Sequence, residues 1–527
     1  MRSTSGSHKS WPAALLLTAS LAAAQGVAQV APAGSTAAQP VVSTQPEPPR
    51  RPSGPAIGVP TLGMPSVHDP STVVRFQGRY YVYSTGRGIP FFSSPDLETW
   101  TREGSIFPQI PEAVHAAVPK NNGTDVWAPD IVRVGGQFYL YYAVSSWGSF
   151  NSAIALATNP VLDPKDPHYK WTDRGVVVSS DGVEDLNAID PGVILAPDGT
   201  LWICYGSYHG SIRIAQLDPR TGLALKPKTL GQAIATARES EASDIIFHDG
   251  FFYLFVNHGS CCKGKDSQYN IRVGRSPAIT GPYLDRHQKP LTEGGGSLFL
   301  AAHDHRIGPG HFGRLLDYDA SPTGAEPDGA EPNGVERFSI HYEADLATGG
   351  RPRLDIRPLL WSPDGWPVAG DNLPEAIYQI LSRQSENTLE EHLPTPPKPT
   401  AAGAAPVAAE PPGPPALHLT RYLTLDNEKW TIAPTAGGFY KIVNLTTSDA
   451  IGVLSASTGA TPLALTPYTG ADTQQWRLEQ LPDGSYAIRN KATGLCLAAS
   501  DSAKEPNSIV ATPYAADDLH RWTITTP

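Results

Sequence analysis

Cysteine and charged residues are both scarce in this sequence of 527 residues. Four cysteines are too few for a disulfide-dense scaffold, and none of them forms the C-x-x-C pair that is typical of a zinc site. Charged residues make up 17% of the chain, whereas about 25% is usual for soluble domains. Acidic residues outnumber basic ones, 51 to 40, and the net charge is −11. This balance argues against nucleic acid or an anionic membrane as the main partner.

Long apolar runs are also nearly absent. The one candidate, residues 11–24, is shorter than the roughly 20 residues that cross a bilayer. It follows the basic residues Arg2 and Lys9 and precedes a run of small residues. Residues 1–28 are therefore predicted to be a secretory signal peptide, and the protein is expected to be extracellular or periplasmic.

Proline is abundant, with 52 residues, of which 8 lie in residues 31–60 and 9 in residues 394–415. Tracts of this composition cannot bury enough apolar surface to offset the entropy lost on ordering. We therefore predict a disordered segment at 29–60 and a semi-rigid linker at 393–416. A third Pro- and Gly-rich tract at 320–333 is predicted to be a surface-loop insertion. The folded parts are expected to be a first domain at 61–392 and a second at 417–527.

Helical periodicity is hard to find in the first domain, where short runs rich in Tyr, Phe, Val and Ile recur between Gly, Pro and Asp. One phrase returns five times: GRYYVYST, GQFYLYYA, GTLWICYG, GFFYLFVN and, more weakly, ERFSIHYE. A period near 60 residues with about four strands per unit predicts a five-bladed β-propeller. A β-sandwich would also contain many strands, but it would not repeat one phrase five times. The predicted fold class is therefore all-β.

Polar residues stand at the start of each predicted inner strand. These starts read His68-Asp69-Pro70, Ala128-Pro129-Asp130, Ile189-Asp190-Pro191, Glu241-Ala242-Ser243 and Gly310-His311-Phe312. The first strand of a propeller blade lines the central axis, so these residues should converge on one funnel. A single Asp-Pro is ordinary turn chemistry, but four carboxylates and one histidine at the same phase indicate a site.

Several carboxylates around one dry funnel repel each other, which drives their pKa values apart. Glycoside hydrolysis needs this difference, because one ionised carboxylate acts as the base and one protonated carboxylic acid serves the leaving oxygen. Aromatic rings can stack on the C–H faces of sugars, and Trp147 and Tyr208 are predicted to line the cleft. Trp100 and Trp171 are predicted to fill the wedges between blades instead.

The motifs HDPS, WAPDI, NAIDP, YGSYHGSI, EAS, NHGSCCKG and GPGH occur in this order. In that order the sequence resembles glycoside hydrolase family 43, and within it the endo-1,5-α-L-arabinanases, over residues 64–369. The resemblance implies a five-bladed propeller that hydrolyses internal α-1,5 bonds of plant cell-wall arabinan with inversion of configuration.

The resemblance also implies roles for three carboxyl groups. Asp69 would be the general base that activates water, Glu241 would be the general acid, and Asp190 would tune the pKa of the acid and orient it. A second acid, Glu239, lies two residues before Glu241 on the same side of the strand. An inverting pair needs roughly 6.5–9.5 Å between its carboxyl groups, and we expect this separation between Asp69 and Glu241.

The remaining site predictions concern substrate and metal. The predicted substrate-binding residues are Gly148, Asn187, Ser207 and Tyr208, which match positions that touch substrate in the family, together with Trp147 and Asp130. In arabinanases of the family, the histidine that matches His311 holds a calcium ion near the axis, largely through waters. One calcium ion is therefore implied, although the sequence has no Asp-x-Asp calcium loop.

The second domain repeats at 46 residues. Trp430, Trp476 and Trp522 have this spacing, as do the phrases GFYKIVN and GSYAIRN. Gln474-Gln475-Trp476 resembles the Gln-x-Trp motif of ricin-type β-trefoil lectins, with the tryptophans as core residues. Only two repeats are complete within 417–527, so the first is expected to be shortened or completed by the C-terminal end. The lectin pocket usually has an Asp after Cys-Leu, whereas Ala498 follows here, so the domain either binds sugar or only packs.

Three functions stay open from the sequence. The first is a secreted endo-arabinanase, and the second is an exo-acting α-L-arabinofuranosidase or β-xylosidase of the same family. The third is a non-catalytic carbohydrate-binding propeller, against which the placement of Asp69, Asp190 and Glu241 counts. We expect a monomer that binds neither nucleic acid nor membrane.

Overall fold

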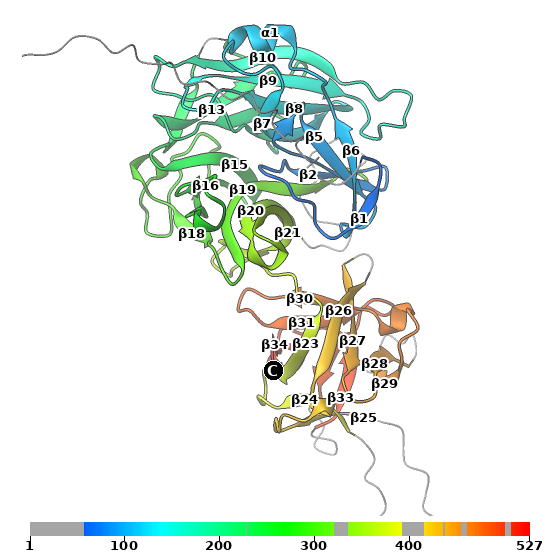
Figure 1. Ribbon diagram of the computed structural model, residues 1–527. Helices are drawn as coiled ribbons and strands as arrows, with labels where there is room; N and C mark the ends of the chain where they lie inside the picture. The colour runs from blue at the N-terminus through cyan, green and yellow to red at the C-terminus, as the bar shows by residue number, and fades with distance from the viewer. Residues whose placement is uncertain are drawn as a thin grey trace, which may run out of the picture. The chain divides into compact units, whose positions relative to one another are not determined.

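The computed structural model describes residues 57–227, 229–320, 336–392, 416–435, 438–454, 461–500 and 507–527. The predicted signal peptide at 1–28 lies outside these ranges, as do nearly all residues of the three proline-rich tracts. Within the described part of the chain, no helix is long and apolar enough to cross a membrane. The fold is all-β, as predicted, with five four-stranded blades followed by a twelve-stranded domain (Figure 1).

The five blades of the β-propeller follow one another along the chain. Blade 1 contains β2 (Val73–Phe76), β3 (Arg79–Tyr83), β5 (Pro90–Ser94) and β6 (Thr99–Ser105), with β1 (Pro60–Leu62) at its outer edge. Blade 2 contains β7 (Asp125–Val134), β8 (Gln137–Val144), β9 (Asn151–Asn159) and β10 (Thr172–Asp181), with the short β4 (Gly86–Arg87) paired to β7. The only α-helix in the described ranges, α1 (Glu112–Ala117), lies in the connection between these two blades.

The other three blades have the same order of strands. Blade 3 contains β11 (Gly192–Leu195), β12 (Leu201–Tyr205), β13 (Ser211–Leu217) and β14 (Gln232–Thr236). Blade 4 contains β15 (Ser240–His248), β16 (Phe251–His258), β17 (Asn270–Ser276) and β18 (Ser297–Leu300). Blade 5 contains β19 (Arg306–Asp317), β20 (Arg337–Asp345), β21 (Arg351–Trp361) and β22 (Pro367–Ala369). The ring closes where β19 pairs in parallel with β2, so that Leu315 lies opposite Val73.

Each inner strand contributes to two hydrophobic cores. Adjacent residues of a strand point to opposite faces, and in a propeller blade both faces pack against a neighbouring blade. In blade 1, Val73 packs toward blade 5 and Val74 toward blade 2. The pairs that divide in the same way in blades 2 to 4 are Ile131 and Val132, Val193 and Ile194, and Ile245 and Ile246; in blade 5, Phe312 packs toward blade 4 and Leu315 toward blade 1. These doublets explain why the inner strands read as short apolar runs rather than as alternating ones.

A left-handed residue opens the inner strand of every blade. These residues are Asp69, Ala128, Asp190, Ala242 and His311, and their φ angles lie between 44° and 57°. A β-bulge interrupts the pairing at this point in blades 2, 4 and 5. Non-glycine residues adopt this conformation at a cost of about 1–3 kcal/mol, and they concentrate at functional sites. The five turns therefore mark the equivalent position in each blade, at the start of the strand that lines the axis.

The C-terminal domain begins earlier than the sequence predicted. Its twelve strands are β23 (Ala376–Ser382), β24 (Thr388–His392), β25 (Ala416–Thr420), β26 (Trp430–Thr435), β27 (Phe439–Asn444), β28 (Asp449–Val453), β29 (Thr461–Pro467), β30 (Trp476–Gln480), β31 (Tyr486–Asn490), β32 (Cys496–Ala499), β33 (Ile509–Thr512) and β34 (Trp522–Thr525). Strand β23 pairs with β26 and β34, which Figure 1 shows beside it. The predicted boundaries at 392 and 417 are therefore wrong, because residues 376–392 belong to the second domain.

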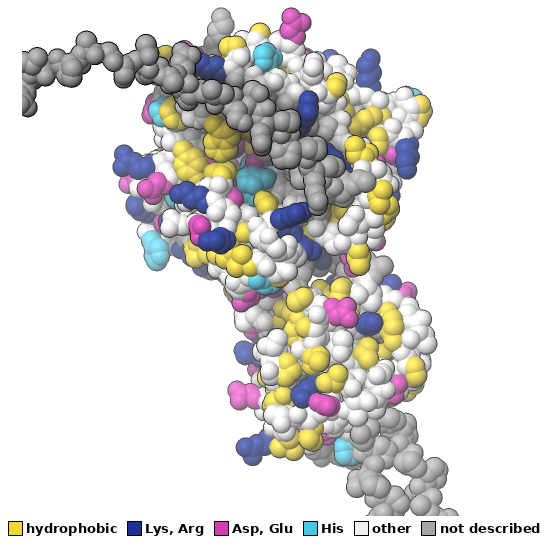
Figure 2. All heavy atoms as spheres, in the orientation of Figure 1, with side chains coloured by type: hydrophobic (Ala, Val, Ile, Leu, Met, Phe, Trp, Pro, Cys, Tyr) yellow, Lys and Arg dark blue, Asp and Glu magenta, His cyan; other side chains and the backbone are white. Residues whose placement is uncertain are grey.

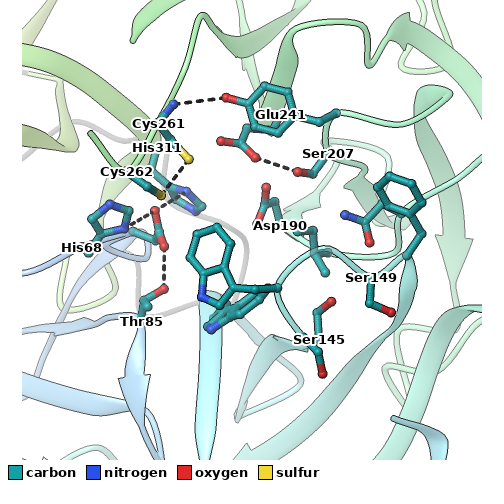
Figure 3. A pocket seen from close by; sticks show the side chains of 18 of the residues that line it. His68, Thr85, Ser145, Ser149, Asp190, Ser207, Glu241, Cys261, Cys262 and His311 are labelled. Carbon is teal, nitrogen blue, oxygen red and sulfur yellow. Dashed lines mark hydrogen bonds and ion pairs between the residues drawn. The ribbon is translucent and has the colours of Figure 1, made fainter. Parts of the chain in front are cut away.

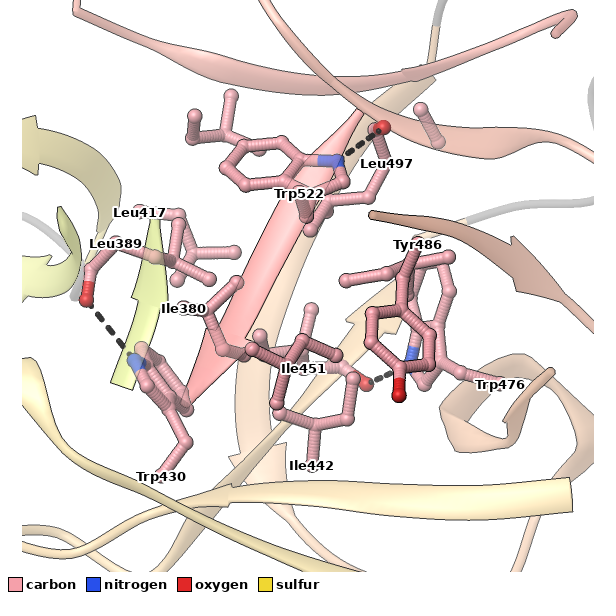
Figure 4. Close-up of a cluster of buried hydrophobic side chains, with 14 of the residues drawn as sticks. Ile380, Leu389, Leu417, Trp430, Ile442, Ile451, Trp476, Tyr486, Leu497 and Trp522 are labelled. Atoms are coloured by element: carbon pink, nitrogen blue, oxygen red, sulfur yellow. Dashed lines mark hydrogen bonds between the residues drawn. The ribbon is translucent and has the colours of Figure 1, made fainter. Parts of the chain in front are cut away.

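These early strands complete the threefold repeat. The indole N–H groups of Trp430, Trp476 and Trp522 donate to the carbonyl oxygens of Leu389, Ile451 and Leu497 at 2.8–2.9 Å (Figure 4). All three tryptophans are fully buried, as predicted for core residues. Leu389 comes from β24, so the first repeat runs from β23 to β26 and is neither shortened nor completed by the C-terminal end.

The predicted interdomain linker is instead a connection inside the first repeat. His392 and Ala416 are paired residues of β24 and β25, so residues 393–415 join two neighbouring antiparallel strands. The equivalent connections in the other repeats run from β28 to β29 and from β32 to β33. This proline-rich tract therefore connects two strands of one repeat and does not mark the domain boundary.

Charged side chains are scattered over the described surface. Figure 2 shows Lys and Arg interspersed with Asp and Glu on the face in view, without one block of either sign. Among the ion pairs of the described residues, Arg286 lies 2.8 Å from Asp364 at the surface, and Arg75 lies 2.8 Å from the buried Asp317. This face therefore presents no extended field of one sign.

Candidate active site

The left-handed turns of the blades open into a pocket of about 260 Å³. Nine of the ten predicted site residues line it: Asp69, Trp147, Gly148, Asn187, Asp190, Ser207, Tyr208, Glu241 and His311 (Figure 3). They come from all five blades, which explains how residues up to 242 positions apart reach one site.

Asp69 lies at the centre of a network of histidines. Its Oδ1 atom is 2.9 Å from His68 Nδ1 and 3.3 Å from His311 Nδ1, and its Oδ2 atom accepts a 2.6 Å hydrogen bond from the Thr85 hydroxyl. Burial alone would raise the pKa of Asp69, but the charges of His68 and His311 and their hydrogen bonds outweigh it. The pKa therefore lies well below 3.8, and Asp69 is ionised at neutral pH.

Glu241 faces the same pocket, and its pKa is shifted in the opposite direction. It is 7% exposed, and burial raises its pKa. Hydrogen bonds from Ser207, at 2.6 Å, and from the Tyr269 hydroxyl lower this pKa only in part, while the charge of Asp69 raises it further. Glu241 can therefore hold a proton while Asp69 holds none, which is the pairing that an acid and a base require.

Asp190 is the third buried carboxyl group. Its pKa is raised well above 3.8, first by burial and then by the charges of Glu241 and Asp69. The backbone N–H of Ala242 donates to it and opposes this shift. Because the charges of Asp190 and Glu241 each disfavour ionisation of the other, Asp190 is placed to influence the proton on Glu241.

Ser207→Ala should move the basic limb of the kcat/KM profile to higher pH. The Ser207 hydroxyl donates to Glu241 and stabilises its ionised form, so losing it raises the pKa of Glu241. The shift should be about one pH unit, because a hydrogen bond to a charged group contributes roughly 1.5 kcal/mol and one unit equals about 1.4 kcal/mol. Ser145→Ala is the matched control, since that pocket hydroxyl bonds to Ser152. A basic limb that stays in place or moves to lower pH in Ser207→Ala would contradict this assignment.

Asp130, the tenth predicted site residue, does not line the pocket. The left-handed residue of blade 2 is Ala128, so Asp130 stands two positions further along, level with Ser71 and Asp244. It is buried, and its two oxygens accept the backbone N–H groups of Thr72 at 3.0 Å and Val193 at 2.8 Å. The prediction that Asp130 binds substrate is therefore wrong, because its carboxylate ties the inner strands of blades 1 and 3 to blade 2.

Asp130→Asn should reduce stability rather than turnover. An amide can accept only one of the two N–H groups and leaves the other facing an NH₂ group, which costs about 1–3 kcal/mol. Thermal unfolding should show a lower Tm, while kcat at a temperature where the variant is folded stays close to wild type. Asp266→Asn, at an exposed surface pair, is the control with unchanged Tm. A large loss of kcat at unchanged Tm would instead return Asp130 to the site.

Aromatic side chains form one rim of the pocket. Trp147 is 80% exposed and its ring lies 5.6 Å from that of Trp127. Phe150 stacks on His209 at 4.0 Å, and Tyr208 donates its hydroxyl to the carbonyl of Gly259. Exposed rings of this kind can stack on sugar faces beyond the catalytic carboxyl groups. Trp100 and Trp171 pack between blades, as predicted.

The alternative acid, Glu239, is exposed and does not line the pocket. It has a left-handed backbone, and its carbonyl accepts the N–H of Gly259. Of the two acids in this segment, only Glu241 is in a position to act in the pocket.

Sequence reasoning missed the supporting roles of four residues that hold the catalytic candidates in place. They are His68, Tyr269, His341 and Glu343. His341 accepts the backbone N–H of Asp69, and Glu343 lies 3.3 Å from His68 Nε2. The charges of His68 and His341 and the hydrogen bonds from them hold the pKa of Glu343 at about 2, although burial opposes this. Tyr269 donates to Glu241. The histidine of the HDP motif and the end of the fifth repeated phrase, SIHYE, were the available signals.

The residues around His311 do not form a calcium cage by themselves. Calcium prefers six to eight oxygen ligands, whereas His311 offers Nδ1 to Asp69, which is already engaged by His68 and Thr85. Among the described residues, the clusters of possible ligands are His68, Asp69 and His341, and His68, Cys262 and Glu343, neither of which contains His311. Calcium therefore stays a prediction that would need water ligands.

Comparison with known proteins agrees with this geometry. The model of the glycosyl hydrolases family 43 matches residues 63–367, and that of the ricin-type beta-trefoil lectin domain-like family matches residues 426–513. The extracellular exo-α-(1→5)-L-arabinofuranosidase ArbA of Cellvibrio japonicus is 34% identical over 315 residues, which is 57% of this chain and 85% of that protein. The extracellular endo-α-(1→5)-L-arabinanase 1 of Bacillus subtilis is 34% identical over 309 residues, or 57% and 87%.

A solved structure shares the fold of the propeller. The α-L-arabinanase of Cellvibrio cellulosa complexed with arabinohexaose superposes with a TM-score of 0.52 at 31% identity. The match covers 58% of this chain and 96% of that one. The likeness thus extends over the propeller.

Proposed function

The chain belongs to the glycosyl hydrolases family 43, and on this premise we propose that its propeller cleaves internal α-1,5-arabinofuranosidic bonds of arabinan with inversion of configuration. The observation that carries the proposal is the opposite pKa shift of two carboxyl groups in one pocket, down for Asp69 and up for Glu241. The arabinan-active relatives support the choice of substrate.

The proposed reaction is a single displacement. Glu241 donates its proton to the glycosidic oxygen as the bond to the anomeric carbon breaks. Asp69 accepts a proton from a water molecule whose oxygen attacks that carbon from the opposite face. Asp190 lies in the same pocket, where ionisation of either carboxyl group, Asp190 or Glu241, disfavours ionisation of the other. Water is thereby added across one glycosidic bond, and the enzyme is restored when Asp69 gives its proton to solvent and Glu241 takes one from solvent.

Endo action is the first candidate, because the exposed Trp147 and Phe150 extend the rim beyond the carboxyl groups and can engage further sugar units. The second candidate is exo action, which the similarity to ArbA favours. Product analysis on linear arabinan distinguishes them. Early release of mixed oligosaccharides supports endo action, whereas a single short product from the start supports exo action. No release of sugar from any arabinan would reject both.

We also propose that the protein is secreted. Both relatives named above are called extracellular, and the first residues of this chain read as a signal peptide. Fractionation of the producing cells should find the enzyme outside the cytoplasm.

The proposal extends to sugar binding by the first repeat of the β-trefoil. The residue after Leu389, Ile451 and Leu497 is Glu390, Gly452 and Ala498, so only the first repeat has a carboxyl group at this position. Glu390 lies 3.4 Å from His392, whose ring stacks on His418. A carboxylate beside an imidazole ring can accept hydrogen bonds from sugar hydroxyls.

Glu390→Ala should weaken retention on insoluble arabinan without changing kcat on a short arabino-oligosaccharide. Losing one charged hydrogen-bond partner should reduce affinity by about tenfold, or roughly 1.4 kcal/mol. Glu386→Ala, at an exposed turn of the same repeat, is the matched control. Equal retention of both variants and wild type would reject this binding site.

A further inference from the structure

Two adjacent thiols lie in the wall of the catalytic pocket. The loop after β16 brings Cys261 and Cys262 there together with Asp69 and Glu241 (Figure 3). Their Sγ atoms are 2.7 Å apart, and both are free cysteines. The mechanism proposed above uses neither of them. The other two cysteines are buried in strands of different domains.

The backbone holds the two sulfurs against each other. The N–H of Cys261 donates to the Tyr208 hydroxyl at 3.3 Å, and the N–H of Cys262 donates to Glu343 Oε1 at 2.9 Å. Cys262 has a φ of 63°, which costs a non-glycine residue about 1–3 kcal/mol. The surrounding contacts therefore impose this geometry on the pair.

The two thiols differ in reactivity. Cys262 is the more exposed, and the hydrogen bond from Cys261 together with the neighbouring His68 lowers its pKa to about 6, although burial opposes this. The pKa of Cys261 is raised, first by its hydrogen bond to Cys262 and then by burial. A thiolate beside a protonated thiol is the arrangement of an attacking cysteine and a resolving cysteine.

We propose that Cys261 and Cys262 form a thiol–disulfide modification site that takes small disulfide oxidants into the catalytic pocket. The Cys262 thiolate attacks one sulfur of the oxidant, which breaks the S–S bond and releases one thiolate. Cys261 then gives its proton to the released thiolate and attacks Cys262 Sγ, which releases a second thiolate that takes up from solvent the proton lost earlier by Cys262. Two cysteine thiols and one disulfide thus become one Cys261–Cys262 disulfide and two free thiols.

The intermediate adduct and the final disulfide should affect the enzyme differently. A mixed disulfide at Cys262 places a bulky group beside Asp69 and Glu241, whereas the internal disulfide adds no atoms. An enzyme that cannot resolve the adduct should therefore lose activity. Resolution by Cys261 should restore access to the pocket.

The test uses oxidised glutathione on the full chain, reduced beforehand and freed of reductant without oxygen. Intact-mass and peptide mass spectrometry should show that wild type loses two hydrogens at Cys261 and Cys262 and retains no glutathione. Cys261→Ser should retain one glutathione at Cys262, and Cys262→Ser should react at neither position. The turnover of each protein on arabinan is compared before and after treatment.

Turnover by Cys261→Ser should fall about tenfold or more on treatment, since the adduct occupies a pocket of about 260 Å³, and a thiol reductant should restore it. Wild type should keep most of its turnover. The proposal is wrong if wild type keeps both thiols free, if Cys261→Ser gains no adduct at Cys262, or if the adduct leaves turnover unchanged. The turnover readout rests on the proposed function, but the mass readout does not, so failure of one is distinguishable from failure of the other.

Discussion

Glu241→Gln should lower kcat on linear arabinan by about 10³-fold, within the 10²–10⁴ that general acid catalysis contributes. The amide has the size and hydrogen-bonding capacity of the protonated acid but cannot give up a proton to the glycosidic oxygen. Ser207 and Tyr269 can still contact it, so the fold should survive.

Two substrates with different leaving groups distinguish loss of the general acid from general damage to the site. An aryl arabinofuranoside departs without full protonation, so Glu241→Gln should lose far less activity on it than on arabinan. Glu239→Gln is the matched control, because this exposed residue lies two positions away and outside the pocket. Wild-type turnover of arabinan by Glu241→Gln, or an equal loss in Glu239→Gln, would refute the assignment of the acid.

Asp69→Asn should be at least as damaging, and its loss of activity should not depend on the substrate. The base acts on water, which every substrate requires, so kcat should fall by about 10³-fold on both arabinan and the aryl substrate. Asp125→Asn, an exposed carboxylate of blade 2, should behave like wild type. Activity of Asp69→Asn on the aryl substrate close to wild type would show that Asp69 is not the base.

The dependence of activity on pH tests the same two assignments, of Asp69 as the base and Glu241 as the acid. Asp69 must be ionised to act, and its pKa is held well below 3.8 by His68 and His311. Activity should therefore persist as the pH falls to about 4 and be lost only below it. The basic limb follows Glu241, whose pKa is raised by burial, because activity is lost as the acid gives up its proton.

The repeated phrase was enough to predict the blades because each blade must bury both faces of its inner strands. Apolar doublets such as Val73 and Val74 recur for this reason, and they keep the repeat visible in the sequence. Asp69, Asp190 and His311 were found because each occupies the left-handed position of its blade. The same reasoning failed for Asp130, since the left-handed residue of blade 2 is Ala128, two positions earlier, and this cannot be seen without the backbone angles.

The contacts that shift the pKa values of the site residues could not be predicted from the sequence, for another reason. Tyr269 lines the pocket and Glu343 contacts His68 behind it, both from strands or loops far along the chain, and neither lies in a motif whose chemistry identifies its role. The C-terminal boundary failed because residues 376–392 and 416–435 form one repeat across a 23-residue tract. Only strand pairing shows that this tract connects neighbouring strands.

Proton NMR of the first sugar released from an α-1,5-arabino-oligosaccharide tests the central claim most directly. A water molecule activated by Asp69 attacks opposite the leaving group, so the first product should have the β configuration and change to the anomeric mixture only later. This result should require both Asp69 and Glu241. A first product with the α configuration would show retention, and it would contradict the single displacement on which this mechanism rests.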